Sequence, residues 1–177
     1  WDEQALRFRT AAAERATVST ASRRTQDRTE PSEAPNPLAF ENCSDTDFTV
    51  PANRAWITAH LEDPRIPHPS IVDTDEAVDH LVRSAVSAQR EWATTDWAAR
   101  RDVLAAVAQV FEDQRGRTIA LMAHTTAKTV REGDPEVSEA IDFARYAAHL
   151  TLAHDAAVDA GAQWRPHRVV VVAGPWN

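Results

Sequence analysis

The sequence predicts an α/β fold in which helices precede and cover a buried strand. Four segments between residues 73 and 148 repeat apolar residues at helical spacing, and a β-branched run, Val169–Val172, follows them. Because this run does not alternate with polar residues, we expect both of its faces to be covered, as in a parallel sheet packed by helices. The sequence has no second run of this kind, so we expect the neighbouring strands to be encoded elsewhere, in a larger protein.

Two long amphipathic helices are expected first. One begins at Asp73, which forms a capping-box-like pair with Glu76. The next follows a cap at Thr95 or Asp96 and ends near Gly116. Apolar residues recur on one face of each: Val78, Leu81, Val82, Ala85, Val86 and Trp92 on the first, and Val103, Leu104, Val107, Val110 and Phe111 on the second.

Two further helices are expected before the strand. A shorter one covers Thr118–Lys128. The last begins at Asp134, whose side chain can cap it, with Pro135 at the first helical position, where proline is tolerated. Its apolar face continues through Val137, Ile141, Ala144 and Ala148.

The chain is expected to divide into three parts. Residues 1–37 are predicted to be a linker from an upstream domain, helical near the start and rich in Ser, Thr, Arg and Pro after it. Residues 38–72 are predicted to form an extended N-terminal arm that ends in a proline-rich turn. Residues 73–177 then form the helical part and the first strand of an incomplete domain. A first residue other than Met also indicates a chain cut from a longer protein.

Composition excludes several classes of protein. The 27 acidic and 19 basic residues give a formal charge of -8, which opposes binding to nucleic acids and to anionic membranes. No apolar run approaches the roughly 20 residues that a membrane helix needs. The four glycines form neither a G-x-G-x-x-G turn nor a P-loop, and the seven histidines show no metal-ligand spacing, so no metal site is expected.

The single cysteine, Cys43, cannot form an internal disulfide, which fits a reducing cytoplasm. We do not expect Cys43 to be a nucleophile, because the nearby Glu41, Asp45 and Asp47 disfavour its thiolate.

Several segments resemble the aldehyde dehydrogenase superfamily. Residues 42–48 (NCSDTDF) and 51–56 (PANRAW) are similar to the N-terminal segment of its 1-pyrroline-5-carboxylate (L-glutamate γ-semialdehyde) dehydrogenase branch. Residues 136–143 resemble a helix of the same branch, and residues 174–177 (GPWN) match the superfamily's proline-tryptophan-asparagine turn. The sequence departs from the family at Cys43 and Ser44, where glutamate and proline are usual, and at Ala127, where glycine is common.

The resemblance implies an oxidoreductase with the aldehyde dehydrogenase fold. In the implied reaction a cysteine thiolate adds to L-glutamate γ-semialdehyde, hydride passes to NAD, and water releases L-glutamate, as a step of proline degradation. Asn177 matches the family's asparagine, whose amide donates a hydrogen bond to the oxyanion of the adduct. Ala173, Gly174, Pro175 and Trp176 match the backbone beside the nicotinamide ribose. The reacting cysteine and the general-base glutamate are expected downstream of residue 177.

Each of these residues also has an ordinary structural interpretation. Asn177 can bond its own backbone in a turn, and Gly174-Pro175 can be a simple strand-to-loop turn. Glu139 matches a glutamate near the aldehyde end of the family's substrate pocket, but it can equally be a solvated residue beside Asp142 and Arg145. NAD is the default cofactor of this branch, and NADP stays an alternative.

The linker resembles the connection in bifunctional enzymes in which a proline dehydrogenase domain that uses FAD precedes the aldehyde dehydrogenase. The expected partners are a small aldehyde substrate and further copies of the complete chain. The alternative is a non-enzymatic helical interaction or regulatory module derived from the front half of an aldehyde dehydrogenase. The dehydrogenase interpretation depends on Val169–Val172 being an inner strand.

Overall fold

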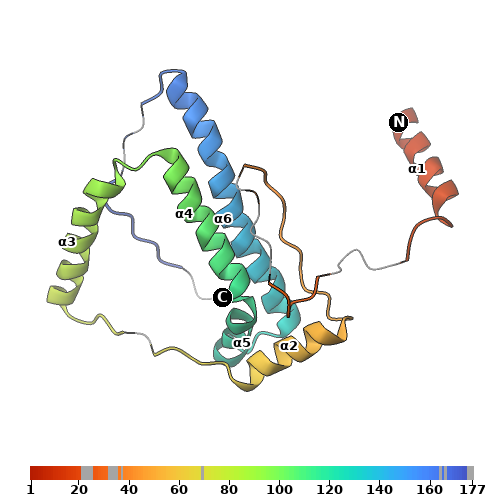
Figure 1. The fold of residues 1–177 in the computed structure, drawn as a ribbon, viewed down its shortest axis with the longest axis horizontal. Coiled ribbons are helices and arrows are strands. Elements are labelled where there is room, and N and C mark those ends of the chain that lie inside the picture. Colours follow the sequence, from red (N-terminus) through yellow and green to blue (C-terminus); the bar gives the residue numbers. More distant parts are fainter. Residues whose placement is uncertain are drawn as a thin grey trace.

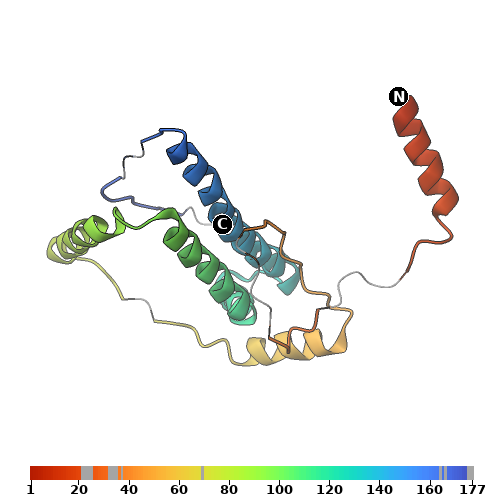
Figure 2. The same cartoon turned by 45° about the horizontal axis from the view of Figure 1, so that its top comes forward.

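The computed structural model describes residues 1–20, 26–31, 36, 38–68, 70–163, 165 and 167–174. The regular structure of these residues consists of α-helices: α1 (Asp2–Glu14), α2 (Pro51–Glu62), α3 (Asp75–Trp92), α4 (Trp97–Asp113), α5 (Arg115–Thr126) and α6 (Val130–Asp159). Helices α4 and α6 lie side by side, with α5 and α2 at one end of the pair (Figure 1). Helix α1 stands apart from this body, which the turned view of Figure 2 also shows.

The predicted α/β fold is wrong for the described residues, which contain no β-strand. Residues 168–174 run as an extended, exposed segment, and Val171 and Val172 expose 86% and 88% of their surface. The physical reason is that a strand needs a neighbour to bond its backbone N–H and C=O groups, and none of the described segments provides one. Val169–Val172 therefore does not form the inner strand on which the dehydrogenase interpretation depended.

Side-chain caps set where α3 and α4 begin. The Ala77 N–H donates to Oγ1 of Thr74 at 3.2 Å, so α3 is capped by Thr74 and not by Asp73. The Ala99 N–H donates to Oδ1 of Asp96 at 2.7 Å, which selects Asp96 as the cap of α4. Both expected helices are confirmed; α3 begins two residues later than expected, and α4 begins at one of its two predicted caps.

The last helix begins earlier than expected. Thr129 precedes α6, and its backbone N–H donates to Oε2 of Glu132 at 2.8 Å, as in a capping box. Pro135 then lies inside the helix, where it forgoes one backbone hydrogen bond. Asp134 is consequently free of any capping role, and its buried carboxylate bonds to other parts of the chain.

The turn after α5 contains a residue in an unfavourable conformation. Ala127 has a φ of 59°, in the left-handed region that favours glycine. An alanine there costs about 1 kcal/mol relative to a right-handed conformation. This position is the one where the resembling family commonly has glycine.

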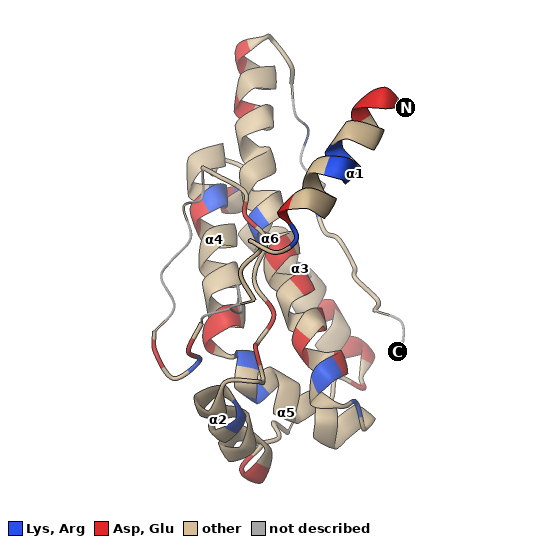
Figure 3. Ribbon diagram, turned by 90° about the vertical axis from the view of Figure 1, so that its right-hand side faces the viewer, with Lys and Arg blue, Asp and Glu red and all other residues tan. Residues whose placement is uncertain are grey.

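Charged residues are spread over the helices. In the view of Figure 3, Lys and Arg are scattered among acidic residues and form no broad basic band. None of the helices in the described part of the chain is long and apolar enough to span a membrane.

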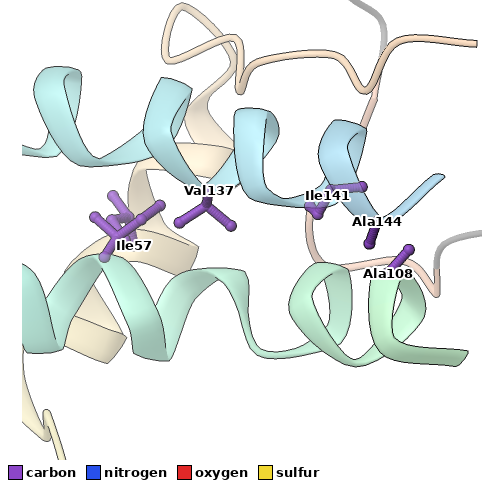
Figure 4. Packing of buried hydrophobic residues seen from close by; sticks show 6 residues of the cluster. Ile57, Ala108, Val137, Ile141 and Ala144 are labelled. Carbon is purple, nitrogen blue, oxygen red and sulfur yellow. The ribbon is translucent and has the colours of Figure 1, made fainter. Parts of the chain in front are cut away.

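One small apolar core joins α2, α4, α5 and α6. Its buried members meet between the helices (Figure 4) and are Ile57, Ala108, Ile119, Val137, Ile141 and Ala144. The alanines at the contact of α4 with α6 let the two backbones approach closely, because they occupy little space. The apolar face predicted for the last helix is confirmed, since Ala148 is buried as well.

Helix α3 packs along no other described helix, and its predicted apolar face is exposed. Its connection to α4 is a corner built around Arg100, whose side chain donates to the carbonyls of Trp92 and Thr95 at 2.6 and 3.0 Å. The guanidinium carbon lies 4.7 Å from the ring centre of Trp92 and 5.2 Å from that of Trp97. The corner orients the start of α4 against the end of α3.

Gly116 allows the close approach of α2 to α5. A Cβ at this position would lie 2.6 Å from Nε2 of His60 and 2.7 Å from Cζ2 of Trp56. Glycine inside a helix normally costs about 1 kcal/mol relative to alanine. Here that cost is offset by the contact that it permits, and Gly116 lies inside α5, one turn beyond the helix end it was expected to mark.

We expect Gly116→Ala to destabilise the protein by about 1–3 kcal/mol, because the added methyl group forces α2 away from α5. Urea unfolding followed by far-UV circular dichroism measures the change. Gly174→Ala is the matched control, since no described atom beyond its chain neighbours lies within 4 Å of the corresponding Cβ position. A Gly116→Ala protein as stable as Gly174→Ala would contradict the packing of α2 on α5.

Candidate functional site

The residues predicted to contact a cofactor lie at the end of the described chain. Ala173 and Gly174 are exposed and extended, and the space around Gly174 is open. Pro175, Trp176 and Asn177 lie outside the described residues. Ala173 and Gly174 by themselves therefore do not form a cradle that would fit a dinucleotide.

Glu139 is exposed on α6 and makes no hydrogen bond or ion pair with a described residue. Asp142, one helical turn further along α6, is the carboxylate that accepts hydrogen bonds from another segment. The Asn42 side chain and the Cys43 backbone N–H each donate to Asp142 at 2.6 Å. The structure thus connects Asp142 to residues 42–43, and it does not connect Glu139 to residues 168–174.

A set of buried and half-buried side chains, four charged groups and one thiol, lies where α4, α5 and α6 meet. We call it the arginine cluster; its members are Arg28, Cys43, Glu112, Arg115 and Asp134. At its centre, Arg115 is 1% exposed and donates to Oδ1 of Asp134 at 2.9 Å and to Oε2 of Glu112 at 3.1 Å. Both carboxylates are also buried, with 2% and 8% of their side-chain surface exposed.

Arg28 enters the arginine cluster from a segment distant in sequence. Its guanidinium forms an ion pair with Oε1 of Glu112, and only 10% of its side chain is exposed. It also donates to Oγ1 of Thr46 at 3.1 Å and to the carbonyl of Ser44 at 2.7 Å. Glu112 is therefore shared by two arginines, which balances the charge of the cluster because Asp134 supplies the second negative charge.

The electrostatics of the arginine cluster are dominated by burial and by this sharing. Burial alone would raise the pKa of Glu112, but Arg115 and then Arg28 outweigh it and hold the pKa below 4.5. Its contribution to stability is therefore complete above pH 4.5 and is lost as the pH falls through the lowered value. Burial lowers the pKa of Arg28, whereas Glu112, Cys43 and Asp134 together overcome burial and raise that of Arg115.

Cys43 is held as a neutral thiol. Burial raises its pKa to about 11; the Arg115 guanidinium, 2.8 Å from Sγ, acts in the opposite direction, and Glu112 adds to the increase. The Cys43 thiol donates to Oε2 of Glu112 at 3.3 Å. The raised pKa of Cys43 agrees with the expectation that it is a weak nucleophile, and its main cause is burial and not the acidic residues next to it in sequence.

The arginine cluster was not predicted from the sequence. Arg28 lies in a segment whose composition is typical of a solvated linker, and Asp134 was interpreted as a helix cap. The available signal was Glu112 with Arg115, since opposite charges three residues apart commonly meet. Among the described residues, no group of three or more His, Cys, Asp or Glu side chains is arranged to hold a metal ion. The chemistry of the cluster is that of a structural ion network, because its groups bond one another.

Comparison with known proteins assigns the family. Residues 70–177 match the family model described as the aldehyde dehydrogenase family. This match covers more than half of the chain, and the chain belongs to that family. The assignment rests on sequence similarity along the helices and the segment after them, so it does not depend on an inner strand.

A curated relative is the bifunctional protein PutA of Salmonella typhimurium strain LT2. The two sequences are 31% identical over 105 residues, which is 59% of this chain and 8% of PutA. The chain thus spans a small part of the length of the curated relative that it matches. No solved structure matches the chain.

We expect Cys43 to react slowly with iodoacetamide in the folded protein. At pH 8 a thiol of pKa about 11 has about 100-fold less thiolate than one of pKa 9.0, and burial slows it further. Mass spectrometry of the alkylated chain measures the rate, and Cys43 is the only cysteine to follow. The same chain in concentrated urea is the control. Equal rates in the two conditions would contradict the buried, neutral thiol.

Proposed function

We propose that this chain is part of an NAD-dependent dehydrogenase that oxidises L-glutamate γ-semialdehyde to L-glutamate in proline degradation. The observation that carries the proposal is the family match over residues 70–177, which includes the sequence Gly174-Pro175-Trp176-Asn177. The similarity to PutA favours the branch, because the same chain also contains residues 42–56 that resemble semialdehyde dehydrogenases. The substrate is then a small aldehyde that carries an amino acid group.

In this proposal Asn177 stabilises the oxyanion that forms when a thiolate adds to the aldehyde. A side-chain amide suits this role because it donates an N–H and does not titrate. To act, the amide must lie about 2.7–3.1 Å from the developing charge. The backbone of Ala173, Gly174, Pro175 and Trp176 is proposed to line the nicotinamide-ribose side of the cofactor site. Aldehyde dehydrogenases as a family use NAD or NADP, which supplies the hydride acceptor when it is bound.

The reacting thiol in this proposal is not Cys43. Its thiol is half-buried and bonded to Glu112, and its raised pKa of about 11 favours the protonated form at neutral pH. The nucleophile and the general base would come from other parts of the natural protein. We accordingly propose that residues 1–177 by themselves do not oxidise the semialdehyde.

The wider proposal is a bifunctional protein in which a flavin-dependent proline dehydrogenase domain precedes this chain. The similarity to PutA, which is named a bifunctional protein, supports it. A cytoplasmic location and a homo-oligomeric assembly belong to the same proposal; the free thiol of Cys43 fits a reducing compartment.

A non-enzymatic interaction module is the second candidate. The exposed apolar face of α3 favours it, since such faces commonly bind partners. The two candidates differ in one measurement: NAD reduction by the natural protein with semialdehyde supports the dehydrogenase, and its absence in a correctly folded protein supports the module.

We expect Asn177→Ala in the natural protein that carries this chain to lower kcat by about 10²- to 10³-fold, because one oxyanion donor is lost. Steady-state NAD reduction with the semialdehyde measures it, and circular dichroism checks the fold. Gln163→Ala, an amide removed from an exposed position, is the matched control. Unchanged turnover in Asn177→Ala would refute the assigned role.

We expect Glu139→Ala to raise the KM for the semialdehyde in the same protein if Glu139 borders the substrate. The control is Glu136→Ala, which removes a carboxylate from the same helix where it pairs with Lys128. Competition with short unbranched aldehydes distinguishes a substrate contact from a general loss of stability. Normal kinetics for the semialdehyde would identify Glu139 as a solvated residue.

A further inference from the structure

Two segments that are separated by ten residues are hydrogen-bonded to each other and to the helical body. We call Gln26–Pro31 the strap and Asn42–Thr49 the arm. The Gln26 side chain donates to the carbonyl of Asp45, and Arg28 donates to Ser44 and Thr46. Three groups of the arm are therefore bound from one side by two residues of the strap.

The arm is also bound by two carboxylates of α6. Asp134 accepts both the backbone N–H of Thr46, at 2.6 Å, and its hydroxyl, at 2.7 Å. Asp142 accepts the backbone N–H of Cys43 at 2.6 Å. The arm is thus bound by both the strap and the helical body. Thr46 is bonded by both of them, and Cys43, which is bonded by α6, is next to Ser44, which is bonded by the strap.

Asn53 of α2 joins the strap and the arm through one side chain. It is fully buried; its Oδ1 accepts the Arg28 backbone N–H at 2.8 Å, and its Nδ2 donates to the carbonyls of Gln26 and Asp47 at 3.0 Å each. The Arg28 N–H is the donor that bonds Oδ1 of Asn53 among the described residues. Loss of the strap would therefore leave this buried amide oxygen without a hydrogen bond. Burial without a hydrogen bond is costly, which couples the strap to the arm.

The strap is attached by polar contacts alone. Its residues are polar apart from Pro31, which is exposed, and a cavity of about 490 Å³ lies between it and Trp56, Glu112 and Asp113. No apolar side chain of the strap therefore anchors it. Arg28 provides the buried contact with Glu112, and Glu112 also bonds Arg115 and Cys43.

We propose that Arg28 is a latch, such that the strap and the arm detach from the helical body together, as one unit, once Arg28 leaves Glu112. Withdrawal of Arg28 removes two arm contacts directly, those to Ser44 and Thr46, and leaves Glu112 with one arginine fewer. A movement of the chain at residue 26 is thereby transmitted to Cys43 and to α6. The latch is a conformational device of the chain and does not depend on the proposed dehydrogenase activity.

The test measures opening of the arm in the 177-residue chain with Arg28→Met. Cys43 is partly covered and its thiol bonds Glu112, so opening of the arm should expose it. We therefore expect its reaction with a disulfide reagent to be about 10- to 100-fold faster than in the unsubstituted chain. The direction of the change in rate separates opening from a purely electrostatic effect. Loss of a positive charge near the thiol would by itself favour the neutral form and slow the reaction. Hydrogen exchange of the Cys43 and Thr46 amides, which bond to α6, should accelerate together with that of the Arg28 amide.

Arg54→Met is the matched control, because Arg54 is an exposed arginine that donates to the carbonyls of Phe48 and Thr49 at the end of the arm. We expect it to change the Cys43 rate by less than about twofold. Faster exchange of the strap amides alone, with the Cys43 and Thr46 amides unchanged, would overturn the proposal. Faster exchange at Ile119 and Ile141 would show that Arg28→Met unfolds the helices. In that case Arg28→Lys replaces it, and the Cys43 reaction rate and the exchange of the Cys43 and Thr46 amides decide the proposal in the same way.

Discussion

The ion pairs of Arg115 with Asp134 and Glu112 are the interaction on which the described body depends. They lie where three helices meet, and two other segments of the chain bond to the same carboxylates. A buried charge is tolerated only when it is paired and hydrogen-bonded, so each of these groups requires the others. The apolar core beside them is small and includes several alanines, which leaves much of the specificity of the arrangement to the polar network.

Local signals in the sequence located most of the helices, but they missed α2 (Pro51–Glu62), which lies in the segment predicted to be an extended arm, and the contacts that need a distant partner. Periodicity and caps located α3, α4 and the buried face of α6 because these features lie within one segment. The capping box at Thr129 and Glu132 was overlooked, which displaced the start of α6. The segment 168–173 has strong β propensity, yet propensity forms no strand without a neighbour to pair with.

The site predictions illustrate the same limit. Glu112 and Arg115 are close in sequence, but Arg28 and Asp134 join them only through folding, and no pattern marked either residue as buried. The predicted cofactor and oxyanion residues were identified by resemblance to a family. The family is established by the comparison over residues 70–177, and the roles of individual residues remain proposals that follow from it.

The Arg100 corner gives α3 the properties of a lever. This helix has 18 residues, which corresponds to a length of about 27 Å at 1.5 Å per residue. Since no other described helix packs along it, a rotation of about 10° at the corner would displace its Asp75 end by about 5 Å. The contacts of Arg100 with Trp92, Thr95 and Trp97 thus set the direction in which the amphipathic helix α3 extends from the rest of the body.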